Sequence, residues 1–129
     1  MENRRWLVFA NNDNCRHDKA FVEQGFVSWN PQNRKFRVGD TVYLYMSKDC
    51  GVRFKTRVVE VDVPRQDLKY WTVKPTDGLT CKLELVAEYE GNALSATEMM
   101  KHGFKGGGSI ELPLCNNVQL LDYIEEQFK

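Results

Sequence analysis

The segment over residues 52–63 constrains the fold of this chain most, because its apolar pattern changes parity half-way along. Every second position carries the pattern, first at Phe54, Thr56 and Val58. After Val58 it moves to the other parity, at Val59, Val61 and Val63. Successive side chains of a strand point to opposite faces, so one change of parity predicts a β-bulge or a strand that serves two packing faces. Pro64 ends this strand or places it at an edge, because proline cannot donate to the ladder. We therefore expect a strongly bent sheet or a small barrel.

The other predicted elements are short. Runs rich in β-branched and aromatic residues, or alternating in polarity, predict strands over residues 5–10, 41–46, 82–89 and 110–112, with a further apolar patch at 26–29. Capping residues and helical spacing predict helices over residues 17–24, 95–103 and 116–128. The mixture indicates an α+β fold with a curved, largely antiparallel sheet of five or six strands and three short helices.

The length of 129 residues predicts a single domain over residues 1–129, since no repeat or linker divides the chain. A chain with 42% hydrophobic and 28% charged residues is neither disordered nor a coiled coil. No apolar run approaches the roughly 18–20 residues of a membrane span, and the first residues lack a signal-peptide core. We therefore expect a cytoplasmic protein.

The four cysteines predict neither a disulfide framework nor a zinc site. Cys15, Cys50, Cys81 and Cys115 are widely spaced and form no C-x-x-C pair. In a reducing cytoplasm we expect free thiols. Cys15 and His17 can hold a metal ion only with further ligands, so we expect no metal and no other cofactor.

Catalytic candidates are few. His17 and His102 are the only ordinary bases at neutral pH. His102 falls in the last turn of a predicted helix, where a cation interacts favourably with the helix dipole. The glycine-rich run over residues 103–109 lacks the order of a phosphate-binding loop, and no hydrolase or metalloprotease motif occurs. The chain is therefore expected to be non-catalytic.

The three tryptophans carry more information. Trp6 belongs to the first predicted strand and is expected in the core, whereas Trp29 and Trp71 fall beside turn-forming residues. An indole ring in a loop among polar residues is a common binding element, because its flat face stacks on bases. A loop tryptophan equally often covers the core.

The order of these segments resembles the EVE domain family, which belongs to the PUA-like superfamily with the YTH and ASCH domains. The resemblance runs through residues 6–12, 25–29, 38–47 and 52–62, and its second half is similar to stand-alone members with a terminal helix. Its most specific part is the run Gly39-Asp40-x-Val42-Tyr43-x-Tyr45-x-Ser47.

The resemblance implies a PUA-like, strongly bent mixed or antiparallel β-barrel flanked by helices. It also implies a reader module that accepts one modified nucleobase, methylated or hydroxymethylated for example, in an aromatic pocket. Aromatic faces stack on a base taken out of its helix, while polar groups read its edge. The partner would be DNA or RNA.

Carried over position by position, the resemblance implies seven nucleobase-binding residues: Asn11, Asn12, Ser28, Trp29, Tyr45, Ser47 and Trp71. Trp29 matches the first cage aromatic, and Trp71 the second wall. Ser28 can donate a hydrogen bond beside the cage.

Two alternatives stay open. One is a small ASCH-like enzyme acting on RNA or a nucleotide, with His17, Lys19 or Asp13 as acid or base. The other is an interaction module with a degenerate pocket. For a nucleic-acid partner, alternating basic residues on the bent strand are expected to contact phosphate: Arg53, Lys55 and Arg57. A solvated strand face explains the same pattern.

The net charge of zero hides an uneven distribution. Residues 1–74 contain 14 Lys and Arg against 9 Asp and Glu, whereas residues 75–129 contain 4 against 9. All three tryptophans lie in the basic half. This distribution is compatible with one basic face toward a phosphate backbone, although the zero total argues against tight, charge-driven binding.

Overall fold

The computed structural model describes residues 3–31, 34–105, 112–113 and 117–129. A six-stranded sheet has the strand order β2-β5-β4-β3-β1-β6. Its strands are β1 (Arg5–Ala10), β2 (Phe26–Trp29), β3 (Thr41–Met46), β4 (Gly51–Val63), β5 (Thr80–Glu88) and β6 (Leu112–Pro113). The helices are α1 (His17–Gln24), α2 (Ala96–Met100) and α3 (Val118–Gln127), with a 3-10 turn, η1 (Leu68–Tyr70). The α+β class is as predicted.

The sheet is mixed and open. β1 runs parallel to β3, and all other neighbouring strands are antiparallel. Among the described residues the two edge strands, β2 and β6, do not pair with each other, so the predicted closed barrel is wrong. The physical reason is strand length: edges of four and two residues offer too few backbone groups for the staggered pairing that closure requires.

The change of parity predicted for residues 52–63 is present in the burial pattern of β4. Phe54, Thr56 and Val58 are buried, and beyond them the partly buried positions switch to Val59, Val61 and Val63. The pairing of β4 with β5 shifts register between Val58 and Glu60 and at two other places. Bulges bend a strand and increase its twist, so β4 belongs to two packing regions.

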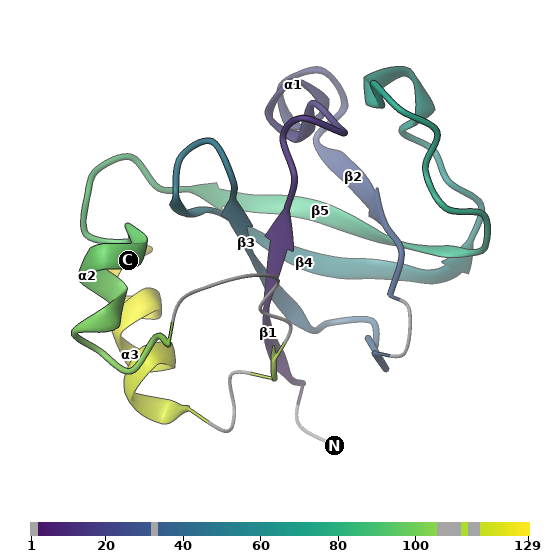
Figure 1. The fold of residues 1–129 in the computed structure, drawn as a ribbon. Coiled ribbons are helices and arrows are strands. Elements are labelled where there is room, and N and C mark those ends of the chain that lie inside the picture. Colours follow the sequence, from purple (N-terminus) through teal and green to yellow (C-terminus); the bar gives the residue numbers. More distant parts are fainter. Residues whose placement is uncertain (1–2, 32–33, 106–111, 114–116) are drawn as a thin grey trace.

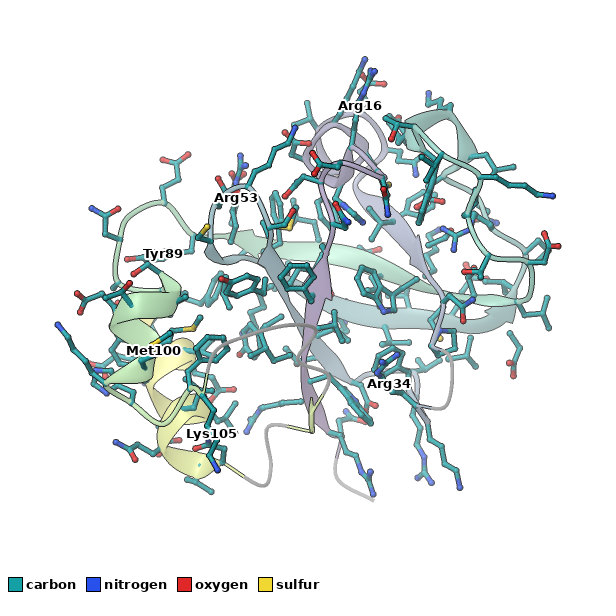
Figure 2. All side chains as sticks on the ribbon, viewed as in Figure 1. Arg16, Arg34, Arg53, Tyr89, Met100 and Lys105 are labelled. Atoms are coloured by element: carbon teal, nitrogen blue, oxygen red, sulfur yellow. The ribbon has the colours of Figure 1, made fainter. Side chains whose placement is uncertain are left out.

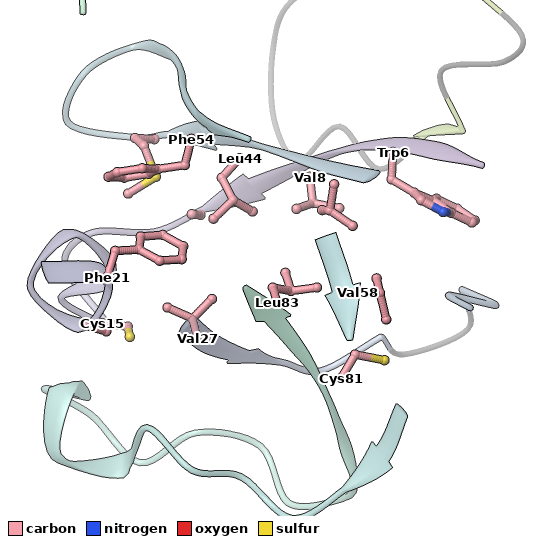
Figure 3. Close-up of a cluster of buried hydrophobic side chains, with 14 of the residues drawn as sticks. Trp6, Val8, Cys15, Phe21, Val27, Leu44, Phe54, Val58, Cys81 and Leu83 are labelled. Atoms are coloured by element: carbon pink, nitrogen blue, oxygen red, sulfur yellow. The ribbon is translucent and has the colours of Figure 1, made fainter. Parts of the chain in front are cut away.

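The bend brings two parts of the sheet over one core. In Figure 3 the side chains of Val8, Leu44 and Phe54 approach those of Val27, Leu83 and Cys81 from the opposite side. Phe21 of α1 closes this core against Phe54, with ring centroids 4.6 Å apart. Trp6 is also buried here, as expected, and its indole N–H donates to Asp40.

A second core lies between the other face of the sheet and the C-terminal helices. Leu7, Tyr43 and Val52 pack there against Leu94, Met99 and Ile124. Figure 1 shows α2 and α3 side by side and far from α1. The helices therefore cover separate parts of the sheet and leave the end of β2 near α1.

The helix predictions hold with small shifts. Ser95 caps α2 as expected, since its hydroxyl accepts the Glu98 backbone N–H. α3 is capped by Asn117 rather than Asn116, because Asn117 Oδ1 accepts the Leu120 N–H. Cys115, the Gly106–Gly108 run and most of the strand predicted at 110–112 lie outside the described residues. No described helix is both long enough and apolar enough to cross a membrane.

Candidate functional site

A cavity of about 370 Å³ opens between the end of β1, the start of α1, β2 and the segment after β4. Four of the seven predicted nucleobase-binding residues line it: Asn11, Ser28, Trp29 and Trp71. Both tryptophans pack against the first core yet stay partly exposed. They are therefore neither fully in the core nor free on the surface, and each indole contributes to the lining of the same cavity.

Backbone hydrogen bonds position Trp71. Cys15 and Trp71 form an antiparallel bridge, the Arg16 N–H donates to the Tyr70 carbonyl at 2.8 Å, and the Thr72 N–H donates to the Asn14 carbonyl at 2.9 Å. The asparagine-rich turn after β1 is thereby joined to η1. These hydrogen bonds place Trp71 next to the start of α1.

A buried carboxylate organises the floor of the cavity. The side chain of Asp67 is fully buried and accepts three hydrogen bonds, from the Ser28 backbone N–H (3.0 Å), Arg65 Nη1 (3.0 Å) and Trp71 Nε1 (3.1 Å). Arg65 Nη1 also donates to the Ser28 carbonyl, and the guanidinium lies 4.6 Å from the centre of the Trp71 ring. We call Asp67, Arg65, Ser28 and Trp71 the floor network.

The floor network fixes the orientation of Trp71 from two sides, by the indole N–H and by a cation–π contact. It also neutralises the Arg65 charge with a carboxylate. The cavity is thus polar and preorganised without a free cation in its floor network, which suits a neutral planar ring better than an anion.

His17 also lines the cavity, although no local sequence pattern places it there. It is only 4% exposed, and its ring centroid lies 6.0 Å from that of Trp29. Burial lowers the pKa of His17 to about 4, while Asp67, Asp18 and the Cys15 backbone act in the opposite direction. The imidazole is therefore neutral at pH 7. Within the described part of the chain, its Nδ1 has no hydrogen-bond partner.

Cys15 is buried beside the cavity and is not an activated nucleophile. Burial raises the pKa of its thiol to about 12, so the thiolate is absent at neutral pH. No group of three or more potential metal ligands is found among the described residues.

Three predicted base-binding residues lie outside the cavity lining. Ser47 Oγ accepts the Asn12 N–H at 3.0 Å, and Asn12 Oδ1 accepts the Lys48 N–H at 3.0 Å. These bonds anchor the turn that carries Asn11 to the end of β3. Tyr45 stacks on Phe9 and Phe104, with centroids 5.2 and 5.9 Å apart. The contacts of all three side chains are thus with neighbouring parts of the protein rather than with the cavity.

The predicted phosphate-contacting residues are also separated from the cavity. Arg53, Lys55 and Arg57 alternate with the core residues of β4 and so point to the other face of the sheet. Arg53 forms ion pairs with Glu88 (2.8 Å) and Asp49 (3.4 Å), and Figure 2 shows it between Arg16 and Tyr89. A hollow of about 420 Å³ beside Arg53 is bordered by carboxylates.

Two residues of the floor network carry no obvious sequence signal. Arg65 and Asp67 follow Pro64 in what looks like an ordinary polar turn. Their burial depends on contacts with Ser28, which lies 37 and 39 positions away. A single sequence contains no pattern from which that contact can be read.

The comparisons with known proteins support the fold. No family model matches the chain, and no curated protein matches it. A solved structure described as a hypothetical protein from Leishmania major is similar, with a TM-score of 0.60 and 18% identity. The match covers 99% of this chain and 98% of that one. At this identity the likeness concerns the arrangement of strands and helices alone.

Proposed function

We propose that this protein is a non-catalytic reader that holds one modified nucleobase of a nucleic acid in the cavity between Trp29 and Trp71. The observation that carries the proposal is the shared cavity, in which two indoles accompany a preorganised polar floor. A volume of about 370 Å³ lies in the lower part of the usual range for ligand pockets, which suits one planar ring system.

The EVE-like order of motifs supports the same function independently of the cavity. Of the seven residues that it implies for base binding, four line the cavity: Asn11, Ser28, Trp29 and Trp71. A methyl or hydroxymethyl group would add apolar area for an indole to cover. The bases concerned would have to leave their stack to enter.

The proposal is tested with single-stranded hexanucleotides of DNA and RNA that differ only at one central base. The series contains the four standard bases, 5-methylcytosine, 5-hydroxymethylcytosine and N6-methyladenine, and binding is measured by calorimetry at low salt. We expect one modified base to bind more tightly than its unmodified parent. Equal affinity across the series, or no binding, contradicts the proposal.

Replacing Trp29 with Ala should weaken binding of the preferred oligonucleotide by about 1–3 kcal/mol, the contribution of one stacked base. Trp29→Phe is the matched variant, since it keeps a smaller aromatic face and should lose less. Arg57→Ala, on the other face of the sheet, should leave base selectivity unchanged. A Trp29→Ala variant that folds and binds like the parent contradicts the proposal.

The enzyme alternative receives less support from the geometry. Of its three proposed acid–base residues, only His17 lines the cavity, whereas Lys19 and Asp13 are exposed. Incubation of the protein with nucleosides and short RNA, followed by product analysis, distinguishes the two. Turnover at the cavity would replace the reader proposal with an enzymatic one.

A further inference from the structure

His17 combines two features that rarely occur together. Its side chain is 4% exposed and lines the cavity, and its Nδ1 is without a hydrogen-bond partner among the described residues. The large majority of buried polar side-chain atoms have a partner, and leaving one unpaired is costly. A half-turn of the ring about its Cβ–Cγ bond exchanges Nδ1 with a carbon, so either ring edge can present a nitrogen to the cavity.

The neighbouring polar groups define what else the cavity offers. Ser28 Oγ already accepts the Gln66 N–H, and Asn11 Oδ1 already accepts the Asp13 N–H. Each oxygen keeps a second lone pair, and the two side chains also keep their donors, one hydroxyl hydrogen and one amide NH2. A ring with carbonyl oxygens or ring nitrogens along the edge that faces them can accept from both donors.

We propose that His17 is a specificity-determining residue of this cavity, whose imidazole hydrogen-bonds the edge of a heterocycle with acceptor atoms beside it. This inference rests on the proposed base-reading function and extends it. A neutral imidazole has one donor and one acceptor, so it can match either a ring N–H or a ring nitrogen. An uncharged group of this kind reads the base edge and adds no attraction for phosphate.

The direct test uses the two histidines of the chain as internal probe and control. Protein labelled with nitrogen-15 is titrated with the hexanucleotides, and the imidazole nitrogens of His17 and His102 are followed by NMR. His102 stacks on Tyr123, with ring centroids 3.7 Å apart, and does not line the cavity. We expect the preferred oligonucleotide to shift the His17 nitrogens and leave those of His102 unchanged.

Variants separate recognition from packing. His17→Phe keeps a ring and removes both nitrogens, whereas His17→Asn and His17→Gln place an amide near the positions of Nδ1 and Nε2. We expect His17→Phe to bind the preferred oligonucleotide about 10-fold more weakly, the effect of one hydrogen bond. At least one of the two amide variants should recover most of that loss.

A second oligonucleotide shows whether the loss of affinity in His17→Phe comes from a lost hydrogen bond or from altered packing. In a matched hexanucleotide the central base is replaced by an apolar isostere without nitrogen or oxygen on its edge. His17→Phe should bind this isostere as well as the parent protein does, because only stacking is involved. An equal loss for both oligonucleotides would indicate a packing role and would overturn the inference.

The outcomes for the two proposals are distinguishable. If the parent protein binds a modified base, but the His17 nitrogens do not shift and His17→Phe retains full affinity, the reader function stands and the role of His17 is wrong. If no oligonucleotide binds the parent protein, the reader function itself fails. Should His17→Phe not fold, the NMR titration of the parent protein still decides.

Discussion

Asp67 is the residue on which the cavity depends most. Its carboxylate is fully buried and accepts hydrogen bonds from Ser28 of β2 and from Arg65 and Trp71 of the segment after β4. Burying a charge is tolerated only when it is paired and hydrogen-bonded. The carboxylate therefore balances the Arg65 charge and orients the indole in the same place.

Asp67→Ala should lower the free energy of unfolding by about 3–5 kcal/mol, because it leaves the Arg65 guanidinium buried and unpaired. Urea denaturation monitored by circular dichroism measures the change. Glu84→Ala is the control, since the Arg57–Glu84 pair is more than half exposed on both sides and should contribute less than about 1 kcal/mol. Similar effects of the two substitutions would show that the floor network is not structural.

His17 should make the stability of the protein depend on pH. Its pKa in the folded state is about 4, below the ordinary value of 6.5, so the unfolded chain binds its proton more readily. Stability from this residue is fully present above about pH 6.5 and falls as the pH drops toward 4, by about 3 kcal/mol in total.

Urea unfolding at several values between pH 7 and pH 4 measures this dependence, and His17→Phe supplies the comparison. The variant should lose the histidine contribution to the slope and be more stable than the parent at pH 5. It should also gain about 1 kcal/mol at pH 7, because an unpaired buried nitrogen is removed. Parallel pH profiles for the two proteins would contradict this account.

At the scale of elements, α2 is short and depends on its cap. Only five residues are helical, and Ser95 Oγ accepts the Glu98 N–H at 3.2 Å. Met99 of this helix is fully buried in the second core. Besides Met99, Ala96 joins α2 to the sheet, since it packs against the second core and its N–H donates to the Cys50 carbonyl at 2.8 Å.

Ser95→Ala should lower the free energy of unfolding by about 1 kcal/mol, the usual contribution of an N-cap. Thermal unfolding of the variant is compared with that of Thr97→Ala, an exposed position of the same helix that should have little effect. Since α2 lies away from the cavity, neither variant should change oligonucleotide binding. A loss of binding in Ser95→Ala alone would link the two regions.

Elements whose signal is local were predicted well, and those that depend on distant contacts were not. Residues 5–10, 17–24 and 41–46 match β1, α1 and β3, because their composition and spacing decide them. The bend of β4 was visible in its change of parity. β2 is recognisable only as an apolar patch, since its strand character comes from pairing with β5.

The residues of the candidate site also fall into those that the sequence predicts and those that it does not. Trp29, Trp71, Ser28 and Asn11 were identified through a resemblance of ordered motifs, and they line one cavity. Arg53, Lys55 and Arg57 were expected near it on charge alone, but strand alternation places them on the other face. His17, Arg65 and Asp67 depend on contacts between separate segments, which no single-sequence pattern reveals.

At the scale of the whole molecule, charge should contribute little to binding. The chain has 18 basic and 18 acidic residues, and Arg53, Arg57 and Arg65 are each within 4.0 Å of a carboxylate. Carboxylates therefore offset part of the positive charge that would otherwise displace counterions from a nucleic acid.

We expect affinity for the preferred oligonucleotide to fall between low and physiological salt with a shallow slope. A plot of log K against log salt should have a slope of magnitude below about 2, equivalent to two or three phosphates on a single strand. Fluorescence titration of the tryptophans over a salt series measures it. A salt-independent affinity, or a slope typical of an extensive phosphate interface, would contradict this view.

The long-range origin of the floor network has a consequence for the rate at which the protein unfolds. Asp67 meets the Ser28 N–H across 39 positions, and Cys15 meets Trp71 across more than 50. Closing such loops costs entropy that nearby contacts must first offset. The cavity should therefore assemble after the folding transition state, so that damage to the network accelerates unfolding and leaves the folding rate nearly unchanged.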